Sequence, residues 1–312
     1  MNLSKTNQWP IAVFDWGTTN LRAHAVDQGG NILRTITSPS GIKFIEPGTC
    51  PARFASIMGQ LRESHRCKHA YLVGMIGSAL GWHEVPMQPG PMNARQIAQN
   101  LSPVQGLPAV IVPGVTAPSI AGLPDMMRGE ETQIFGACRI INRESFHLCL
   151  PGTHSKWVFL KDGAITNITT AMTGELFELL TNASILKQQV AKELHSVDLQ
   201  AFKEGLAVAK TGLGAQILAF STRPRSLVAG KPEGNNAANY LSGILIGSEI
   251  HAMCNALKTP VSEIALIAED SISRLYALAF QEHDIKVRRI DGAHAVAMGA
   301  AMLHRNAIQK AK

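Results

Sequence analysis

The sequence is organised around a segment near its N-terminus, Val13-Phe14-Asp15-Trp16-Gly17-Thr18-Thr19-Asn20-Leu21-Arg22. The apolar run before Asp15 predicts a buried strand, and the alternation of apolar and polar residues after Thr19 predicts a second, half-buried strand. Gly17 lets the backbone between them approach a ligand closely, and the two threonines supply amides and hydroxyls. Asp15 stands where a carboxylate can hold hydrated Mg²⁺ against phosphate oxygens. The turn predicts either a phosphate site or an ordinary hairpin, because Asp, Gly and Thr are common in turns.

The composition describes a globular protein with room for two domains. The chain has 312 residues, of which 46% are hydrophobic and 17% charged, and a domain takes about 150 residues. The net charge of +6 is spread along the chain, and only 5% of residues are aromatic, so we expect no nucleic-acid partner but a preference for small anionic ligands. No apolar run has transmembrane length and the N-terminus lacks a signal-peptide pattern, so we expect no membrane association. Five scattered cysteines without a C-x-x-C pair favour a cytoplasmic location.

The opening pattern recurs in the middle of the chain. The first pair of strands continues into a third at 31–36, and residues 146–150, 156–160 and 164–170 repeat the three-strand arrangement. The second pattern also has a Gly-Thr turn, Pro151-Gly152-Thr153-His154-Ser155, between its first two strands. Two such turns in the same context favour phosphate binding more strongly than one, because each can bind one part of a triphosphate from opposite walls of a cleft.

Helices are expected after both patterns. Acidic residues followed by apolar residues predict a helix start at Glu130, and Thr173 begins another helix. Small residues from Asp291 to Ala301 predict a C-terminal helix that another helix crosses closely, with Gly136 and Ala137 as its partners. Residues 51–66 have helical spacing, and residues 183–260 are expected to be mostly helical, in segments 183–194, 214–220 and 239–257. Further strands are expected at 70–73, 109–112, 264–268 and 285–290, and loops at 86–91 and 113–124.

Three local patterns need separate interpretation. His65-Arg66-Cys67-Lys68-His69 has alternating metal ligands, but no second cluster completes a set, so a solvated segment is the better interpretation. Gly205 to Thr211, GLAVAKT, lacks the second glycine of a P-loop, is one residue short and follows no strand, so we reject it. The loop from Gly74 to Glu84 is rich in glycine, and Trp82 in it is either core packing or a wall for a polyol.

Six segments in order resemble the 2-dehydro-3-deoxygalactonokinases, a family of the sugar-kinase and actin-like ATPase superfamily. They are DWGTTNLR, GMIGSALGW, PDMMRGEETQIFGA, LPGTHSKWV, MTGELFELL and YLSGILIG. The resemblance spans almost the whole chain and implies an α/β, ribonuclease H-like fold of two domains with the active site in the cleft between them. The first domain would comprise residues 1–130 and a C-terminal helix, 293–312; the second would comprise residues 131–292. The implied reaction is phosphorylation of 2-dehydro-3-deoxy-D-galactonate by ATP with Mg²⁺, giving the 6-phosphate in D-galactonate catabolism.

The resemblance also implies roles for individual residues. Asp15 would hold Mg²⁺ and take part in catalysis. The nucleotide would contact the two phosphate turns, at Gly17, Thr18, Thr19, Gly152, Thr153 and Ser155, and the adenosine loop at Ala268. The sugar acid would lie near Ser78, Trp82, Arg128 and Lys156, since an anionic substrate needs cationic contacts and arginine offers a carboxylate two parallel donors.

One position departs from the family pattern. After the strand that ends near Ile267 the family has two glycines, whereas this chain has Ala268 and Glu269. A Cβ atom there would crowd a base or ribose that lies on the backbone. The departure predicts weaker or altered nucleotide binding and leaves the phosphate turns unaffected.

The general base is expected among two neighbouring carboxylates, Glu130 and Glu131. Their side chains point roughly a quarter-turn apart on a helix, so only one can face the reacting centre well. Glu131 is favoured, because its pair with Thr132 resembles the Asp-Thr pair of hexose kinases, and Glu130 would then stabilise the helix N-terminus. The alternative is that both only stabilise the helix.

Two other functions remain open at the level of sequence. One is a kinase for another sugar acid or an anhydro sugar, because the sequence does not show the shape of a pocket. The other is a non-catalytic nucleotide-binding protein on the same fold, which the Ala268-Glu269 departure would suit. The oligomeric state is not determined by the sequence, and a homo-oligomer is compatible with it.

Overall fold

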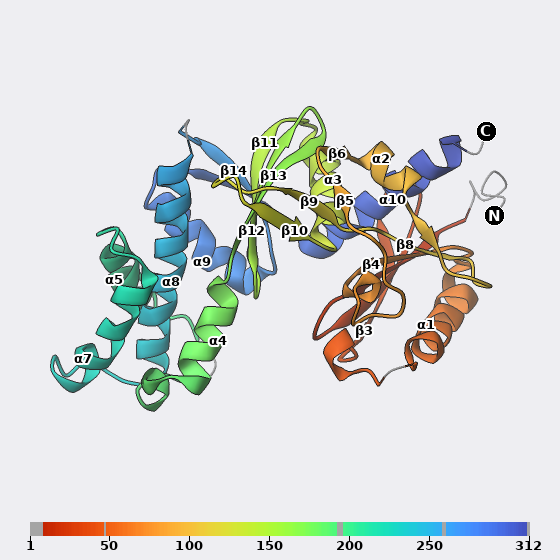
Figure 1. Ribbon diagram of the computed structural model, residues 1–312. Helices are drawn as coiled ribbons and strands as arrows, with labels where there is room; N and C mark the ends of the chain where they lie inside the picture. Colours follow the sequence, from red (N-terminus) through yellow and green to blue (C-terminus); the bar gives the residue numbers. More distant parts are fainter. Residues whose placement is uncertain (1–8, 47, 192–195, 258–259, 311–312) are drawn as a thin grey trace. The chain divides into compact units, whose positions relative to one another are not determined.

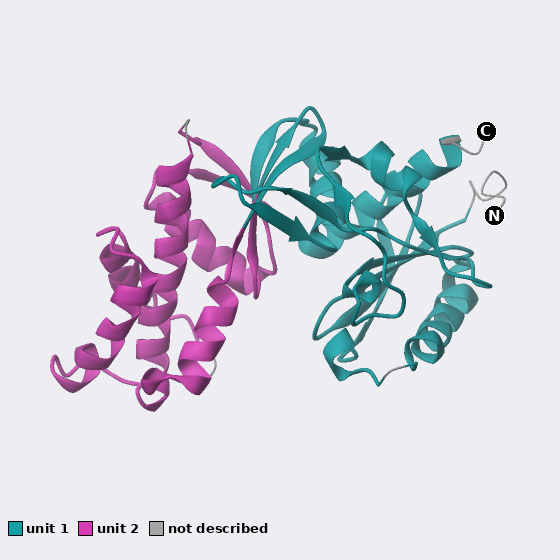
Figure 2. Ribbon diagram, in the orientation of Figure 1, with its two compact units in different colours: residues 1–148, 158–169, 290–312 teal, residues 149–157, 170–289 magenta. Residues whose placement is uncertain are grey.

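The computed structural model describes residues 9–46, 48–191, 196–257 and 260–310 (Figure 1). The chain divides into two compact units (Figure 2): unit 1 comprises residues 1–148, 158–169 and 290–312, and unit 2 comprises residues 149–157 and 170–289. These limits differ from the expected domains, because residues 131–148 and 158–169 lie in unit 1. The C-terminal helix is in unit 1 as well.

A mixed sheet in unit 1 carries the opening segment. Its order is β3-β2-β1-β4-β8-β7; the first three strands form an antiparallel meander, and β1 runs parallel to β4. In the register, Asp15 lies opposite Arg22 on β2 and Trp16 opposite Gly74 on β4. The strands are β1 (Ile11–Trp16), β2 (Leu21–Val26), β3 (Ile32–Ser38), β4 (Ala70–Gly74), β7 (Ser102–Pro103) and β8 (Ala109–Ile111). The five strands that the sequence predicts in this region are confirmed.

One core of unit 1 lies between this sheet and α1 (Cys50–His65). Alternate residues of β1, including Phe14 and Trp16, pack with Phe54 of α1, and all three are almost fully buried. The predicted buried strand and the helical spacing after residue 50 are therefore both satisfied by this contact. The helix ends at Arg66, which takes the left-handed conformation.

Two helices rich in small residues cross closely in unit 1. They are α3 (Glu130–Ile141) and α10 (Gly292–Lys310). A Cβ atom on Gly136 would lie 1.9 Å from Ala295 O, and one on Gly299 would lie 1.9 Å from Thr132 O. The backbones touch at both points, so the predicted close crossing is confirmed and neither glycine has room for a side chain.

The second sheet contains the repeated pattern, and its order is β15-β14-β11-β12-β13-β6. The three predicted central strands are confirmed as β11 (Phe146–Leu150), β12 (Ser155–Lys161) and β13 (Ala164–Ala171). The other strands are β6 (Met92–Asn93), β14 (Glu263–Ile267) and β15 (Lys286–Ile290).

Short strands occupy two segments that the sequence analysis assigns to loops. β5 (Gln88–Pro89), β9 (Val115–Pro118) and β10 (Pro124–Met127) form a three-stranded sheet, so the loop prediction for 86–91 and 113–124 is wrong in part. Each strand has a proline at one end, where a missing N–H disturbs the ladder least. The helix α2 (Ala94–Gln99), which begins with a capping box at Asn93, was not predicted either.

Helices make up most of unit 2 (Figure 1). They are α4 (Thr173–Ala183), α5 (Leu199–Ala209), α6 (Ala215–Leu218), α7 (Thr222–Leu227), α8 (Asn235–Ala256) and α9 (Asp270–Gln281). The helices α5 and α8 touch through glycines: a Cβ atom on Gly205 would lie 2.2 Å from Tyr240 O, and one on Gly243 the same distance from Phe202 O. Gly205 therefore serves helix packing, and GLAVAKT lies at the end of a helix rather than in a phosphate loop.

The helix predicted for 183–194 is wrong over its described part. α4 ends at Ala183, and Ser184 is extended with its side chain accepting a hydrogen bond from Leu186 N. A 3-10 turn (Ile185–Gln188) follows, and Val190 bridges to Gly234. The polar serine thus competes for backbone groups and stops the helix. Residues 192–194, like the N-terminal segment 1–8 and residues 311–312, lie outside the described residues.

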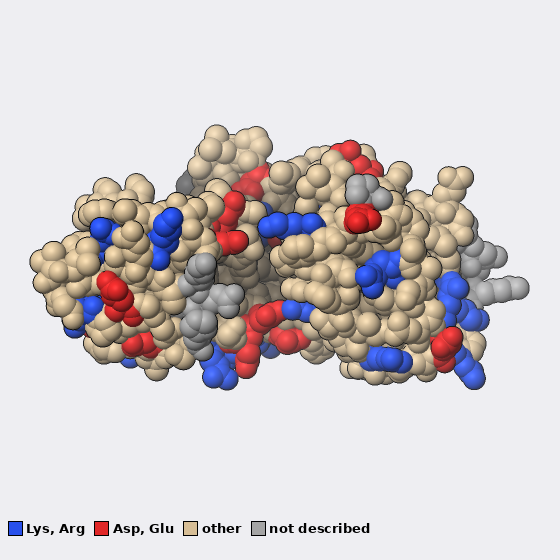
Figure 3. Space-filling model, turned by 90° about the horizontal axis from the view of Figure 1, so that it is seen from below, with Lys and Arg blue, Asp and Glu red and all other residues tan. Residues whose placement is uncertain are grey.

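Three general features of the described residues concern helix length, cysteines and surface charge. Within the described ranges, the helices are all too short or too polar to cross a bilayer. The five cysteines are free thiols. Basic and acidic side chains are interspersed over the face drawn in Figure 3.

Candidate active site

The first Gly-Thr turn is held by its carbonyl groups. The carbonyls of Gly17, Thr18 and Thr19 accept backbone hydrogen bonds of 2.9–3.0 Å from residues 41–43. The amides of Thr18 and Thr19 make none of the backbone–backbone hydrogen bonds found among the described residues, and both residues are exposed. Bonded carbonyls and open amides are what a phosphate-binding turn requires. Asp15, partly buried, is the last but one residue of β1 and precedes the turn.

Three segments of unit 1 meet at the end of β1. Gly74 and Gly129 both have left-handed φ angles, of +93° and +111°. A Cβ atom on Gly74 would lie 2.8 Å from Trp16 O, and one on Gly129 would lie 3.0 Å from Gly74 Cα. The contacts bring the phosphate turn, the glycine-rich loop and the start of α3 together. Gly129 was not among the predicted site residues, although a glycine directly before an acidic helix start was a usable signal.

The two acidic residues at the start of α3 have different environments. Glu131 is fully buried, and its Oε2 accepts from Gly129 N at 2.6 Å while its Oε1 accepts from Thr132 Oγ1 at 3.0 Å. Glu130 is half-buried and accepts from Arg128 N at 3.1 Å. Burial, helped by the nearby charge of Glu130, raises the pKa of Glu131 to about 8. Both carboxyl groups thus satisfy backbone amides, and Glu131 also has the pKa of a base that works near neutrality.

The guanidinium group of Arg128 lies beneath the glycine-rich loop. Its Nη2 donates to Val85 O at 2.7 Å. Its Nη1 is buried without a hydrogen-bond partner in the described structure, and a Cβ atom on Gly77 would lie 2.9 Å from it. Burial lowers the pKa of Arg128, and the charges of Glu131 and Glu84 oppose that shift. A guanidinium group with an unused donor is a candidate contact for an anionic ligand, and in this structure that donor is closed off from solvent beside Gly77.

Ser78 and Trp82 belong to the same loop, in unit 1. The Ser78 hydroxyl donates to Met75 O at 2.7 Å, and the Trp82 ring lies 5.5 Å from the Phe54 ring. Trp82 is therefore partly a core residue, and its other side remains half-exposed. Ser78 follows Gly77, which lies against Arg128, and the contact of Ser78 and Trp82 with a sugar acid stays a prediction.

The second Gly-Thr turn is fixed to the start of α4 in unit 2. Glu175 N donates to Thr153 O at 2.9 Å, and the Glu175 carboxylate lies 2.6 Å from His154 Nε2. A Cβ atom on Gly174 would lie 2.4 Å from Gly152 O, so only glycine fits there. Gly152 and Thr153 are exposed, as their predicted contact with phosphate requires. Gly174 was not among the predicted site residues.

Ser155 and Lys156 are less accessible than the turn before them. Ser155 is fully buried and its Oγ lies 2.8 Å from Tyr276 Oη, so its hydroxyl is used within the fold and its contact with a nucleotide stays a prediction. Lys156 is buried too, and its Nζ donates to Thr170 Oγ1 at 2.8 Å. Lys156 belongs to unit 2, whereas the other three predicted sugar-acid residues belong to unit 1.

The predicted adenosine loop connects β14 to α9. Ala268 is not among the residues with positive φ, and Glu269 has an ordinary extended conformation with φ −66° and ψ 156°. The backbone therefore does not require glycine at either position. Any effect of these side chains on a nucleotide would come from the space and the charge they add.

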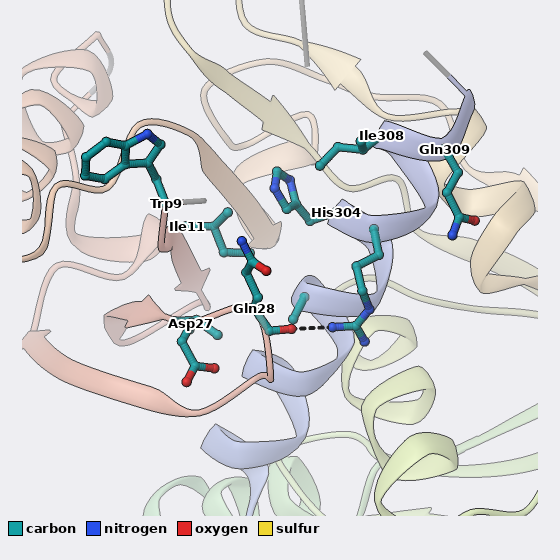
Figure 4. A pocket seen from close by; sticks show the side chains of 10 residues that line it. Trp9, Ile11, Asp27, Gln28, His304, Ile308 and Gln309 are labelled. Carbon is teal, nitrogen blue, oxygen red and sulfur yellow. Dashed lines mark hydrogen bonds between the residues drawn. The ribbon is translucent and has the colours of Figure 1, made fainter. Parts of the chain in front are cut away.

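A cavity of about 290 Å³ in unit 1 contains none of the predicted site residues (Figure 4). Its lining includes Ile11, the first residue of β1, and Val26, the last of β2, so it lies at the far end of these strands from Asp15. His304 and Arg305 of α10 close another side, with Arg305 donating to Gln28 O. We do not count it in the candidate site.

The elements and the two turns define a class of protein, the two-domain α/β fold of the actin-like ATPase superfamily to which sugar kinases belong. Component A of (R)-2-hydroxyglutaryl-CoA dehydratase from Acidaminococcus fermentans shares the fold at 13% identity, with a TM-score of 0.54 over 97% of this chain and 99% of that one. A solved structure from Sinorhizobium meliloti, described as a 2-dehydro-3-deoxygalactonokinase, has 30% identity and a TM-score of 0.81 over 96% and 99% of the two chains.

The particular family follows from two further comparisons. The model of the 2-keto-3-deoxy-galactonokinase family matches residues 15–303. The 2-dehydro-3-deoxygalactonokinase of Escherichia coli (strain K12) is 32% identical over 288 residues, which are 91% of this chain and 94% of that protein. The chain therefore belongs to the 2-keto-3-deoxy-galactonokinase family, and it is a phosphotransferase of that family.

Proposed function

We propose that this protein transfers the terminal phosphoryl group of ATP to 2-dehydro-3-deoxy-D-galactonate, giving the 6-phosphate in D-galactonate catabolism. Membership of the kinase family supports the reaction. The structural observation that carries the proposal is the meeting of Trp16, Gly74 and Gly129, which joins a phosphate turn, a substrate loop and an acidic helix start. These proximities support a site in which the proposed nucleotide-binding turn and the candidate base Glu131 belong to neighbouring segments of unit 1.

In unit 1 the basic and acidic candidate residues would have different roles. Arg128, with its unsatisfied Nη1, would bind the substrate carboxylate, and Ser78 and Trp82 would line the sugar. Glu131 would orient the attacking hydroxyl and accept its proton, while Glu130 would stabilise the helix end. The amides of Thr18 and Thr19 would bind phosphate oxygens. Phosphoryl transfer is mostly positioning and charge stabilisation, and these are the tasks such groups perform.

ATP would bind the second turn through Gly152 and Thr153, which are exposed, while the buried Ser155 would end that turn. In the described chain no three His, Cys, Asp or Glu residues are grouped to hold a metal by themselves. Asp15 at the end of β1 fits the usual mode of Mg²⁺, which takes one or two carboxylates together with substrate phosphates and water. When bound, Mg²⁺ would neutralise charge on the phosphates.

The proposal is tested by measuring ADP formation from ATP with a panel of acceptors. The panel contains 2-dehydro-3-deoxy-D-galactonate, its gluconate epimer, D-galactonate and uncharged D-galactose, and mass spectrometry locates the added phosphate. We expect the highest kcat/KM with the galactonate derivative and phosphate on its terminal carbon. A higher kcat/KM with another acceptor would assign that acceptor as the substrate. ATP binding without turnover on any acceptor would indicate a non-catalytic protein.

Replacing the predicted carboxylate contact should act on the sugar acid alone. We expect Arg128→Lys to raise KM for the sugar acid about 10- to 100-fold, because lysine cannot both donate to Val85 O and bind a carboxylate in a forked geometry, and a hydrogen bond to a charged group contributes about 1.5–3 kcal/mol. KM for ATP should change little. Steady-state kinetics measure both constants, and Arg139→Lys, at an exposed position of the helix α3 that follows Arg128, is the matched control. An equal rise in both constants would contradict the assignment.

Restoring glycine in the adenosine loop should tighten nucleotide binding. We expect the double variant Ala268→Gly, Glu269→Gly to lower Kd for ATP about three- to tenfold, which corresponds to roughly 1 kcal/mol, with little change in kcat. The variant removes two Cβ atoms and one negative charge. Glu269→Gln, which removes only the charge, separates the two causes. Isothermal calorimetry measures each Kd, and an unchanged or higher Kd for the double variant would place the adenosine elsewhere.

A further inference from the structure

One buried carboxyl group joins four elements of unit 2. Glu249 on α8 is 7% exposed. Its Oε1 accepts from Trp157 Nε1 of β12 at 2.7 Å, and its Oε2 accepts from Tyr276 Oη of α9 at 2.6 Å and from Thr173 Oγ1 of α4. Burial raises the pKa of Glu249, and the hydrogen bonds from Thr173, Tyr276 and Trp157 oppose the rise. Helix α8, strand β12 and helices α4 and α9 are therefore tied to one side chain.

Two of the donors to Glu249, Tyr276 and Thr173, lie next to the second Gly-Thr turn. Tyr276 Oη is also 2.8 Å from Oγ of Ser155, the residue that ends the turn. Thr173 directly precedes Gly174, where an added Cβ atom would lie 2.4 Å from Gly152 O and 2.8 Å from Thr153 Cα. A displacement of Tyr276 or Thr173 would therefore move the backbone of the turn.

The same group reaches the adenosine side of unit 2. Tyr276 lies in α9, the helix that begins at Asp270 directly after Ala268 and Glu269. The hydroxyl group of Tyr276 contacts both Glu249 and Ser155. Through it, Glu249 thus fixes the spacing between α9, the helix after the adenosine loop, and the turn that would bind phosphate.

An ionisable side chain at this position is costly. Its surroundings are a hydrophobic core that includes Ile246, Ile250 and Phe280, and replacing a buried polar group by a well-packed apolar one is often neutral or stabilising. The carboxyl group nevertheless has three donors with good geometry, and networks of this kind specify a unique arrangement. Stability alone does not account for Glu249, whereas the placement of the turn does.

We infer that Glu249 is a positioning residue for nucleotide binding, which holds the Gly152–Ser155 turn and α9 in the spacing that ATP needs. The inference rests on the proposed function, in which that turn binds ATP. Glu249 does not touch the substrate or the reacting atoms, and it acts through Thr173, Tyr276 and Ser155. Unit 1, which holds the candidate sugar-acid contact Arg128, is outside this network.

The test compares Glu249→Gln, Glu249→Met and Thr173→Val with the wild type. Glutamine offers one acceptor oxygen to the three donors Trp157, Tyr276 and Thr173, and the methionine thioether is only a weak acceptor. We therefore expect Kd for ATP to rise about tenfold for Glu249→Gln and further for Glu249→Met. Thr173→Val should raise it as well. The matched control is Thr181→Val, on the same helix, since the buried Thr181 hydroxyl donates only to carbonyls of its own helix. Calorimetry gives Kd for ATP, kinetics gives the two KM values, and thermal unfolding gives Tm.

The supporting result is a rise in Kd and KM for ATP with KM for the sugar acid unchanged and Thr181→Val like the wild type. The inference is overturned if ATP binding by Glu249→Gln and Thr173→Val stays within twofold of the wild type, or if both KM values rise together in proportion to the loss of Tm. If Glu249→Met does not fold, the other two variants carry the test. Failure of the proposed function is a separate result, wild-type protein that binds ATP and phosphorylates no sugar acid, and calorimetry still decides the role of Glu249.

Discussion

Glu131→Gln is expected to lower kcat about 10²- to 10⁴-fold, the usual contribution of a general base. The carboxyl group is fully buried at the start of α3, and its pKa is raised to about 8 by burial and by Glu130. Glutamine has nearly the same shape and can still accept the hydrogen bond from Gly129 N. The fold should therefore remain, and circular dichroism together with steady-state kinetics would separate loss of chemistry from loss of structure.

Glu130→Gln is the matched control for this prediction. Glu130 is half-buried, accepts from Arg128 N and has the position of a helix-end charge. Its removal should cost about 0.3–1 kcal/mol of stability and leave kcat within a few-fold of the wild type. If Glu130→Gln is the inactive variant, the two roles are exchanged. If both variants are active, the two residues only stabilise the helix and the base lies elsewhere.

The raised pKa of Glu131 also predicts two pH dependences. A base works when deprotonated, so kcat/KM should rise with pH and level off above about pH 8. Because the pKa of 4.5 in the unfolded chain rises to about 8 on folding, the folded state holds the proton more tightly. The contribution of Glu131 protonation to the free energy of unfolding is therefore fully present below pH 4.5 and is lost as the pH rises through 8. The Tm of Glu131→Gln relative to wild type should accordingly increase between pH 5 and pH 9.

The strand pattern was predictable because strand formation and core burial agree in this sequence. The apolar run of β1 predicts a buried strand without the structure, and alternate residues of that strand pack on α1. The segment after Ala183 was predicted wrongly, because some of its residues are buried without being α-helical. Leu186 and Val190 are buried, as helical spacing suggested, yet the chain there is a 3-10 turn and a bridge. Hydrophobic spacing predicts that a residue is buried, and the local competition of Ser184 for backbone groups decides the conformation.

The candidate site was predictable only where its residues are close in sequence. The first turn and the acidic start of α3 each have a local signature. Their meeting through Gly74 and Gly129 depends on left-handed glycines that are distant in sequence. Glu249 gave a weaker signal, a lone carboxylate in an otherwise apolar helical stretch, and its three partners come from three other elements. Such long-range networks become visible only when the chain is folded.

Asp15→Asn is the second variant with a large expected effect. A bound metal ion contributes several kcal/mol of charge stabilisation in the transition state, and each 1.36 kcal/mol is a factor of ten in rate. Loss of the charged partner of Mg²⁺ should therefore lower kcat about 10²- to 10³-fold. The Mg²⁺ concentration for half-maximal activity should rise too, which a merely structural role of Asp15 would not produce. Kinetics at several Mg²⁺ concentrations measure both effects.

The control must remove the same charge from the same sheet. Asp27→Asn does so beyond the end of β2, where Asp27 accepts hydrogen bonds from Asn31 and lies at the far end of the strands from the turn. It should cost some stability and leave the Mg²⁺ dependence unchanged. Asp15 lies opposite Arg22 in the ladder, so the Tm of Asp15→Asn has to be measured alongside. An Asp15→Asn protein with wild-type turnover would remove Asp15 from the metal site. A folded protein that is slow at low Mg²⁺ and partly recovers at high Mg²⁺ would mean that Asp15 binds the ion. A higher Mg²⁺ concentration fills a metal site whose affinity has fallen, whereas it does not restore a strand that no longer forms.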